Sequence, residues 1–189
     1  ILRFPEFQVF KGEFVIIKGI SGKGKTTWID LLLGLRTPLS GSVKRNFEQR
    51  QNIYLNFNVG KEDILKIFDS YFYKFSKLSG YTNRKKPREN KKLMQICGID
   101  FLNNDSNINL SLLENKGLSS GQYQRLQLFL ALSLNPKILI LDEALNAIEL
   151  ELEHHIIRNI RREFGSLTLI QITHRPYQEE FYNRFYNLE

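Results

Sequence analysis

The stretch Gly19-Ile20-Ser21-Gly22-Lys23-Gly24-Lys25-Thr26 matches the pattern G-x-x-x-x-G-K-[ST] at every fixed place. In this pattern the glycines let backbone N–H groups approach a polyphosphate, the lysine reaches the β- and γ-phosphates, and the last hydroxyl binds Mg²⁺. We therefore predict a phosphate-binding loop at residues 19–26. The residues expected to contact the nucleotide are Gly19, Ser21, Gly22, Lys23, Gly24, Lys25, Thr26 and Thr27.

The residues on either side of this loop predict a strand followed by a helix. The short apolar run Phe14–Lys18 is typical of a buried strand. A helix is expected over residues 26–35, ending near Gly34. Its inner face should carry Trp28, Leu31, Leu32 and Leu35.

A second apolar run, Ile138–Leu141, ends in two adjacent carboxylates, Asp142 and Glu143. In enzymes that transfer a phosphoryl group to water, one carboxylate holds the metal ion and another contacts the attacking water. We assign Asp142 to the metal side, through water, and Glu143 to the attacking water.

A predicted helix begins at about residue 119, within the run Leu118-Ser119-Ser120-Gly121-Gln122. Ser119 and Gln122 have the spacing of a capping box. A helix start also presents free N–H groups and a partial positive charge, which favour a phosphate. The run by itself favours a cap alone, and a phosphate contact is the alternative.

The rest of the chain alternates strands with helices, which predicts an α/β fold with a mostly parallel sheet flanked by helices. Further strands are expected at Ser42–Lys44, Ile53–Leu55, Leu167–Ile172 and Phe185–Leu188, and a helix at 149–164. From about residue 60 to 117 the pattern predicts a helical insertion subdomain. Its helices are expected at 61–78 and 91–97, followed by an irregular polar segment at 100–117.

Length and composition narrow the class of protein. The 189 residues suit a single domain, and no apolar run approaches the roughly 20 residues of a membrane span. The single cysteine, Cys97, excludes an internal disulfide. Because the chain starts at Ile1 rather than Met and its first residues resemble a strand edge, we interpret it as a domain truncated at its N-terminus.

The net charge of +7 is concentrated in residues 84–92. A solvated loop is the simpler interpretation, and contact with anionic lipid or nucleic acid is the alternative. Aromatic residues are not interleaved within this run, which argues against binding to single-stranded nucleic acid.

The phosphate loop, the run Leu118–Gln122 and the carboxylate strand, in this order, resemble the nucleotide-binding domain of an ATP-binding cassette (ABC) protein. Leu118–Gln122 is similar to the family signature L-S-G-G-Q, with Ser120 in place of the first glycine. Thr173-His174-Arg175 follows an apolar run and resembles the family's switch histidine. The resemblance extends from about Gly12 to Glu189, and it implies a P-loop NTPase core that uses ATP and Mg²⁺.

The resemblance also implies roles for individual residues. His174 would contact the γ-phosphate and couple it to Glu143, which makes these two the expected catalytic pair. The metal ligands would be Thr26, Asp142 and Asn58, with either Asn58 or Asn56 supplying a side-chain carbonyl in place of a family glutamine. The residues expected to act in trans, on ATP held by the phosphate loop of a second subunit, are Ser119, Gly121 and Gln122.

The implied partners are a second ABC nucleotide-binding domain, identical or different, in a head-to-tail dimer, and the transmembrane domain of a transporter, fused or separate. Such a domain works at the cytoplasmic side of the membrane, and nucleic acid is not an expected partner. Glu114-Asn115 before the signature, and the ending Ile172–Arg175, favour an exporter over an importer.

Three departures from the family pattern leave alternatives open. Asn56-Phe57-Asn58 contains no glutamine, Asn146–Glu149 replaces Ser-Ala-Leu-Asp, and the aromatic that stacks on adenine would lie upstream of Ile1. One alternative is a degenerate ABC domain that binds ATP without appreciable hydrolysis. Another is a soluble ABC ATPase that acts on nucleic acid or ribosomes, which the basic charge favours.

Overall fold

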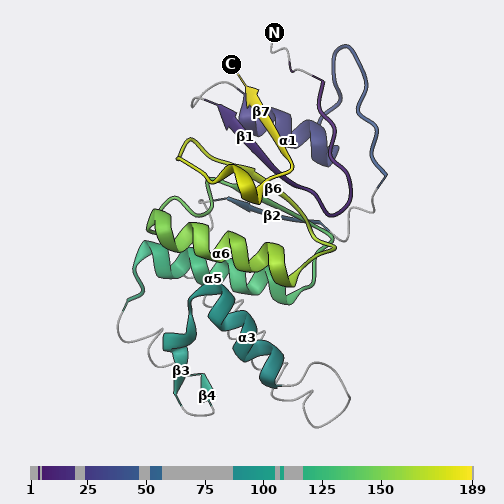
Figure 1. Ribbon diagram of the computed structural model, residues 1–189. Helices are drawn as coiled ribbons and strands as arrows, with labels where there is room; N and C mark the ends of the chain where they lie inside the picture. Colours follow the sequence, from purple (N-terminus) through teal and green to yellow (C-terminus); the bar gives the residue numbers. More distant parts are fainter. Residues whose placement is uncertain are drawn as a thin grey trace.

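The computed structural model describes residues 4, 6–19, 24–46, 52–56, 87–104, 107–108 and 117–188. Within these residues, one sheet of five strands has the order β2-β5-β6-β1-β7, and every neighbouring pair is parallel (Figure 1). The strands are β1 (Phe14–Gly19), β2 (Asn52–Asn56), β5 (Ile138–Asp142), β6 (Thr168–Ile172) and β7 (Arg184–Leu188). The predicted parallel α/β sheet is therefore confirmed.

Helices cover both faces of this sheet, with α1 on one face and α5 and α6 on the other (Figure 1). The main helices are α1 (Lys25–Leu33), α3 (Pro87–Cys97), α5 (Ser120–Ser133) and α6 (Leu150–Glu163). Shorter elements are the 3₁₀ turns η2 (Asp100–Leu102) and η3 (Glu179–Phe181) and the antiparallel pair β3 (Asn103–Asn104) and β4 (Asn107–Ile108).

The side chains of β1 show how the sheet builds two cores. Phe14 and Ile16 point into a large cluster shared with α3, α5 and α6, whereas Val15 and Ile17 point into a smaller one shared with α1. Successive residues of a strand face opposite sides, so a strand that is buried on both sides must be apolar throughout. This explains why the continuous apolar runs of the sequence became the central strands.

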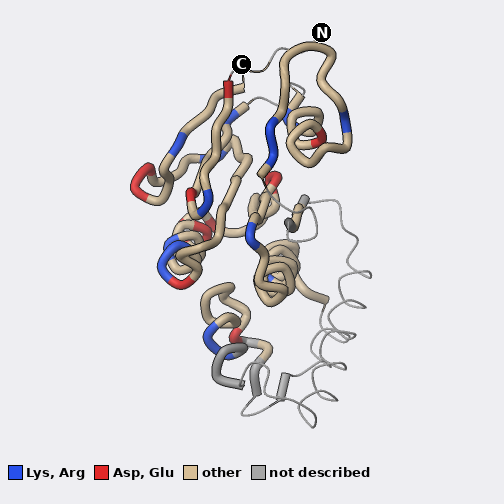
Figure 2. The backbone as a smooth tube through the Cα atoms, turned by 90° about the vertical axis from the view of Figure 1, so that its right-hand side faces the viewer, with Lys and Arg blue, Asp and Glu red and all other residues tan. Residues whose placement is uncertain are grey.

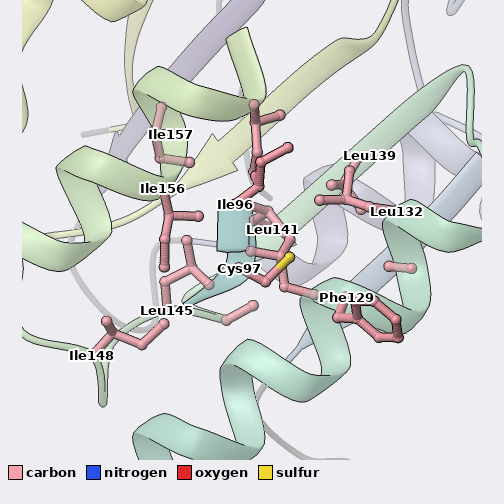
Figure 3. Close-up of a cluster of buried hydrophobic side chains, with 14 of the residues drawn as sticks. Ile96, Cys97, Phe129, Leu132, Leu139, Leu141, Leu145, Ile148, Ile156 and Ile157 are labelled. Carbon is pink, nitrogen blue, oxygen red and sulfur yellow. The ribbon is translucent and has the colours of Figure 1, made fainter. Parts of the chain in front are cut away.

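The larger core joins α3 to the rest of the domain (Figure 3). Ile96 and Cys97 of α3 pack there with Phe129 of α5, Leu141 of β5 and Ile156 of α6. Cys97 is completely buried, and burial raises the pKa of its thiol far above the ordinary value. Since the thiolate is the reactive form, Cys97 acts as a small apolar core residue.

The helix after the phosphate loop ends earlier than predicted. Gly34 adopts a left-handed conformation with φ of 78° and donates its N–H to carbonyls of the last turn, which closes α1 at Leu33. Leu35 is therefore outside the helix and 71% exposed, while Ile29 is buried with Trp28. The prediction of Leu35 on the inner face was wrong, because a glycine at this position ends a helix with a change of chain direction.

Two segments that were predicted to form strand are described by the structure but form none. Residues 42–44 form no strand; instead, Arg45 donates to the carbonyls of Leu31 and Leu32 at the end of α1, which ties this segment to the helix rather than to the sheet. Residues 4 and 6–10 form no strand either. Phe7 lies edge-on to Trp28, with ring centroids 4.4 Å apart, so this N-terminal segment covers α1 through side-chain packing.

The predicted insertion is described only in part. Residues 87–104 and 107–108 contain α3, η2 and the short pair β3–β4, so the segment after Asp100 is more regular than expected. The predicted helix at 61–78 lies outside the described residues, as does the start of the basic run at 84–86. In the described part of the chain, basic and acidic positions are spread over several elements (Figure 2).

Candidate phosphate-binding and catalytic site

The carboxyl ends of β1, β5 and β6 meet at one edge of the sheet. In the strand register, Ile172 lies beside both Ile17 and Asp142. The backbone continues this arrangement past the strands, because Glu143 donates its N–H to the carbonyl of Ile172 at 2.9 Å and Thr173 donates to that of Ile17 at 3.2 Å. Ligands of open parallel sheets bind at this edge, so three motifs distant in the sequence converge on one site.

The start of α1 has the features of an anion-binding helix terminus. Gly24 caps the helix in a left-handed conformation with φ of 88°, no side chain caps it, and its first turn holds no acidic residue. The N–H groups of a first helical turn have no partner within the helix and favour an anion. Gly24, Lys25, Thr26 and Thr27 lie here, and Gly19 ends β1. Their contact with a nucleotide stays a prediction, and the remaining predicted loop residues, Ser21, Gly22 and Lys23, lie outside the described residues.

Lys25, at the start of α1, links the end of β1 to Glu143, the residue that follows β5. Its Nζ donates to Glu143 Oε1 at 2.7 Å and to the carbonyl of Gly19 at 3.0 Å. Hydrogen bonding from Lys25 holds the pKa of Glu143 below its ordinary value, and burial opposes this shift. Glu143, with a side chain 32% exposed, is therefore ionised at neutral pH while remaining open to solvent.

His174 lies beside the same carboxylate. Its Nδ1 is 3.7 Å from Glu143 Oε1, and its side chain is 62% exposed. Asn146 donates its side-chain amide to the other oxygen, Glu143 Oε2, at 3.2 Å. The predicted pair of Glu143 and His174 is thus in contact, with Asn146 as a third member that the sequence had indicated only as a departure from the family pattern.

The backbone of Glu143 is held in an unusual conformation. Its φ is 52°, in the left-handed region that residues with a side chain avoid. Such strain costs on the order of 1–3 kcal/mol and clusters at functional sites. With its backbone in this conformation, Glu143 contacts both Lys25 and His174 through Oε1.

Asp142 has a different environment from its neighbour. Tyr54 of β2 donates its hydroxyl to Asp142 Oδ2 at 2.8 Å, and burial raises the pKa of Asp142 despite this hydrogen bond. Tyr54 was missed by sequence reasoning, because its hydroxyl is brought here only by the pairing of β2 with β5.

The donor set suits Mg²⁺ bound with a phosphate ligand. Asp142 offers one carboxylate, and Thr26 offers an exposed hydroxyl in the first turn of α1. The described ranges contain no group of three His, Cys, Asp or Glu side chains that could hold a metal by themselves. Mg²⁺ typically takes one or two carboxylates together with substrate phosphates and water, so these residues fit it. Asn58, the third predicted ligand, lies outside the described residues.

The start of α5 forms the capping box expected from the sequence. Gln122 donates its N–H to Ser119 Oγ at 3.2 Å, and Ser119 donates its N–H to Gln122 Oε1 at 2.8 Å. Gly121 has a separate packing role, because a Cβ atom there would lie 2.6 Å from the carbonyl oxygen of Ala147. The predicted action of Ser119, Gly121 and Gln122 on a second subunit stays a prediction.

Comparison with known proteins places these observations in a family. The family model described as "ABC transporter" matches residues 2–146. The spermidine/putrescine import ATP-binding protein PotA of Mesoplasma florum is 30% identical over 181 residues, which cover 92% of this chain and 50% of PotA. The Fe(3+) ions import ATP-binding protein FbpC of Photobacterium profundum is 31% identical over 179 residues, which cover 89% of this chain and 48% of FbpC.

A solved structure agrees in fold. An ATP-binding cassette determined as a dimer in a post-hydrolysis state with ADP and Pi superimposes with a TM-score of 0.56 at 21% identity, over 89% of this chain and 78% of that one. The chain spans about half the length of the curated relatives it matches. With the family model matching most of the chain and a relative at 30% identity or more aligned over nearly all of it, this chain belongs to the ABC transporter family.

Proposed function

We propose that this chain is the nucleotide-binding domain of an ABC transporter and that it binds and hydrolyses ATP. The observation that carries the proposal is the convergence of Lys25, Glu143 and His174 beside the start of α1. A phosphate-binding helix terminus next to an ionised carboxylate is the arrangement that transfer of a phosphoryl group to water requires.

Each residue has a role that follows from its position. The N–H groups at the start of α1 and the ammonium of Lys25 bind the β- and γ-phosphates. Glu143 Oε1 accepts the proton of the attacking water, and His174, beside the same oxygen, orients the γ-phosphate relative to that water. Mg²⁺, held through Thr26 and Asp142, would neutralise charge on the phosphate oxygens. Within the described ranges, Glu143 is the only residue whose carboxylate forms an ion pair with Lys25.

We further propose that two such domains join head to tail and power a transmembrane partner at the cytoplasmic side of the membrane. Helices of the described residues are too short or too polar to cross a bilayer. The curated relatives are named as ATP-binding proteins of import systems, which favours import over the export direction expected from the motifs. The relatives differ in cargo, so we propose none.

A binding-only domain is the second candidate. One observation favours it: the amide of Asn146 donates to Glu143 Oε2, which reduces the basicity of the carboxylate that must accept a proton. Turnover by the unmodified protein separates the two candidates. If the unmodified protein shows almost no turnover and either Asn58→Gln or Phe57→Gln restores it, the binding-only domain is correct. Comparable turnover in the unmodified protein and in both variants supports the hydrolysing domain.

The proposal is tested with the full-length protein by nucleotide titration and phosphate release. Lys25→Ala should weaken MgATP binding by about 10- to 100-fold, since a charge-assisted contact contributes about 1.5–3 kcal/mol. Glu143→Gln should retain binding and lose about 10²–10⁴-fold in turnover. Lys137→Ala, at an exposed lysine beyond the opposite end of β5, is the control and should change neither quantity. Unchanged affinity in Lys25→Ala would refute the site.

A further inference from the structure

Arg175 follows His174 in the chain, but its side chain turns into the protein. Its Nη1 lies 3.0 Å from the carbonyl oxygen of Leu145, 2.8 Å from that of Ile148 and 2.7 Å from Glu153 Oε2. The side chain is only 18% exposed. One guanidinium nitrogen therefore holds two backbone carbonyls of the segment that follows Glu143, together with a carboxylate of α6.

The carboxylate of Glu153 is itself fixed from the other side. Gln171 of β6 donates Nε2 to Glu153 Oε1 at 2.7 Å, and Tyr182 donates its hydroxyl to Gln171 Oε1 at 2.6 Å. Glu153 is 3% exposed. Both of its oxygens have donors, so the Arg175–Glu153–Gln171–Tyr182 network is a satisfied buried network of the kind that specifies one geometry.

The segment that Arg175 holds, residues 144–149, has two further contacts, one with Glu143 in the site and one with α5. Asn146 donates to Glu143, and Ala147 donates its N–H to Gln124 Oε1 of α5 at 2.8 Å. The start of α5 packs against Ala147 through Gly121. Residues 144–149 are thus held in place by contacts with Arg175, with α5 and with Glu143.

We propose that Arg175 is a positioning residue for hydrolysis: by holding residues 144–149 against its own loop, it sets the separation of Glu143 and His174. The inference rests on the proposed function, since it concerns the turnover of that site. Arg175 contacts neither nucleotide-binding residues nor Glu143 in the described structure, so its effect on turnover is transmitted through the backbone. A misplacement of about 1 Å at a reacting group can cost roughly 100-fold in rate.

A buried ion pair by itself contributes little to holding a segment in place, because the cost of desolvating the two charges offsets much of their attraction. The two carbonyl contacts add to this ion pair, because they fix residues 145–148 beyond the point where the pairing of β5 with β6 ends. Burial raises the pKa of Glu153, and Arg175 opposes that shift. Without Arg175, the carboxyl is expected to take up a proton and keep its hydrogen bond from Gln171, so the fold survives the substitution.

The test uses the full-length protein with Arg175→Met, Arg175→Lys and the control Arg161→Met. Arg161 also donates Nη1 to a backbone carbonyl, that of Phe181 at 2.6 Å, but Phe181 lies in η3, which holds no catalytic residue. Arg175→Met should lower kcat about 10- to 100-fold with the Kd for MgATP within about twofold. Arg175→Lys should recover much of the rate, because an ammonium group has three donors for the three acceptors around Nη1. Arg161→Met should leave kcat unchanged.

Amide hydrogen exchange provides a readout that does not depend on turnover. In Arg175→Met, exchange should increase at Asn146, Ala147 and Ile148, and it should remain slow there in Arg161→Met. If wild type does not hydrolyse ATP, the proposed function fails while exchange still decides whether Arg175 holds this segment. An unchanged kcat in Arg175→Met, an equal loss in Arg161→Met, or unchanged exchange at 146–148 would each overturn the inference.

Discussion

Asp142 and Glu143 are adjacent carboxylates whose pKa values shift in opposite directions. Burial raises the pKa of Asp142, whereas the hydrogen bond from Lys25 lowers that of Glu143. A raised pKa means that the folded protein binds the proton more tightly than the unfolded chain, so stability falls as pH rises above the ordinary value. A lowered pKa means the reverse, with stability lost as pH falls.

Substitutions of these two residues should therefore have opposite effects on stability at pH 7. Asp142→Asn should raise the free energy of unfolding by about 1 kcal/mol, because it removes a buried charge and keeps an acceptor for Tyr54. Glu143→Gln should lower it by about 1 kcal/mol, because it breaks the contact with Lys25. Thermal unfolding of the nucleotide-free full-length protein measures both, with shifts of about 2–4 °C each. At pH 4 the difference between the two variants should shrink, and a constant difference would contradict the assignment.

Glu143 also competes with a phosphate for Lys25. Glu143→Gln should therefore tighten MgATP binding about fivefold relative to wild type, which corresponds to about 1 kcal/mol. Equilibrium titration measures this. Glu163→Gln is a matched control, since Glu163 also pairs with a lysine, Lys92, far from the site in sequence. Weaker binding in Glu143→Gln than in Glu163→Gln would show that the Lys25 contact does not oppose the nucleotide.

At the scale of elements, the position of α5 depends on Gly121, which has no side chain where the helix approaches Ala147. In most helical positions, replacing glycine with alanine stabilises a protein by roughly 0.5–1 kcal/mol. At Gly121 a Cβ would meet the backbone oxygen of Ala147 at 2.6 Å, a distance that requires either α5 or residues 144–149 to move. The signature glycine thus has a packing role within its own chain, independent of any second subunit.

Gly121→Ala should therefore destabilise the protein by about 1–3 kcal/mol, the usual cost of overpacking. Ser120→Ala, at the neighbouring exposed position, should change stability by less than about 0.5 kcal/mol. Thermal or urea unfolding of the two variants provides the comparison. If both variants behave alike, Gly121 does not set the distance between α5 and Ala147.

At the scale of the whole molecule, the proposed dimer places the start of α5 against a phosphate bound by the other subunit. Ser119 caps α5 with its side chain, and aspartate and asparagine are equally good caps. A charge introduced at this position can therefore be tested without loss of the helix. An aspartate would repel a phosphate, whereas an asparagine would not.

In a Glu143→Gln background that slows hydrolysis, MgATP should drive dimerisation of the full-length protein, as measured by light scattering. Ser119→Asp should weaken this dimer by at least about 10-fold, and Ser119→Asn should leave it nearly unchanged. The Kd of the monomer for MgATP should be the same in both, because Ser119 is not part of its own phosphate loop. Equal dimerisation of the two variants would place the start of α5 outside the interface.

The sequence by itself determined the phosphate loop, the carboxylate pair, the capping box and the parallel α/β sheet. The first three features are local, because glycine spacing, an apolar run that ends in carboxylates and a helix start each lie in one short stretch of sequence. The sheet followed from the alternation of strands and helices along the chain. Only the tertiary structure decided that Tyr54 donates to Asp142, that Gln124 holds Ala147 and that Arg175 ties Glu153 to residues 144–149. These partners are 88, 23 and 22 residues apart, and burial of the sheet and helices brings them together. A polar side chain that will be buried looks the same in a sequence as one that will be solvated, so its partner becomes visible only when the elements have packed.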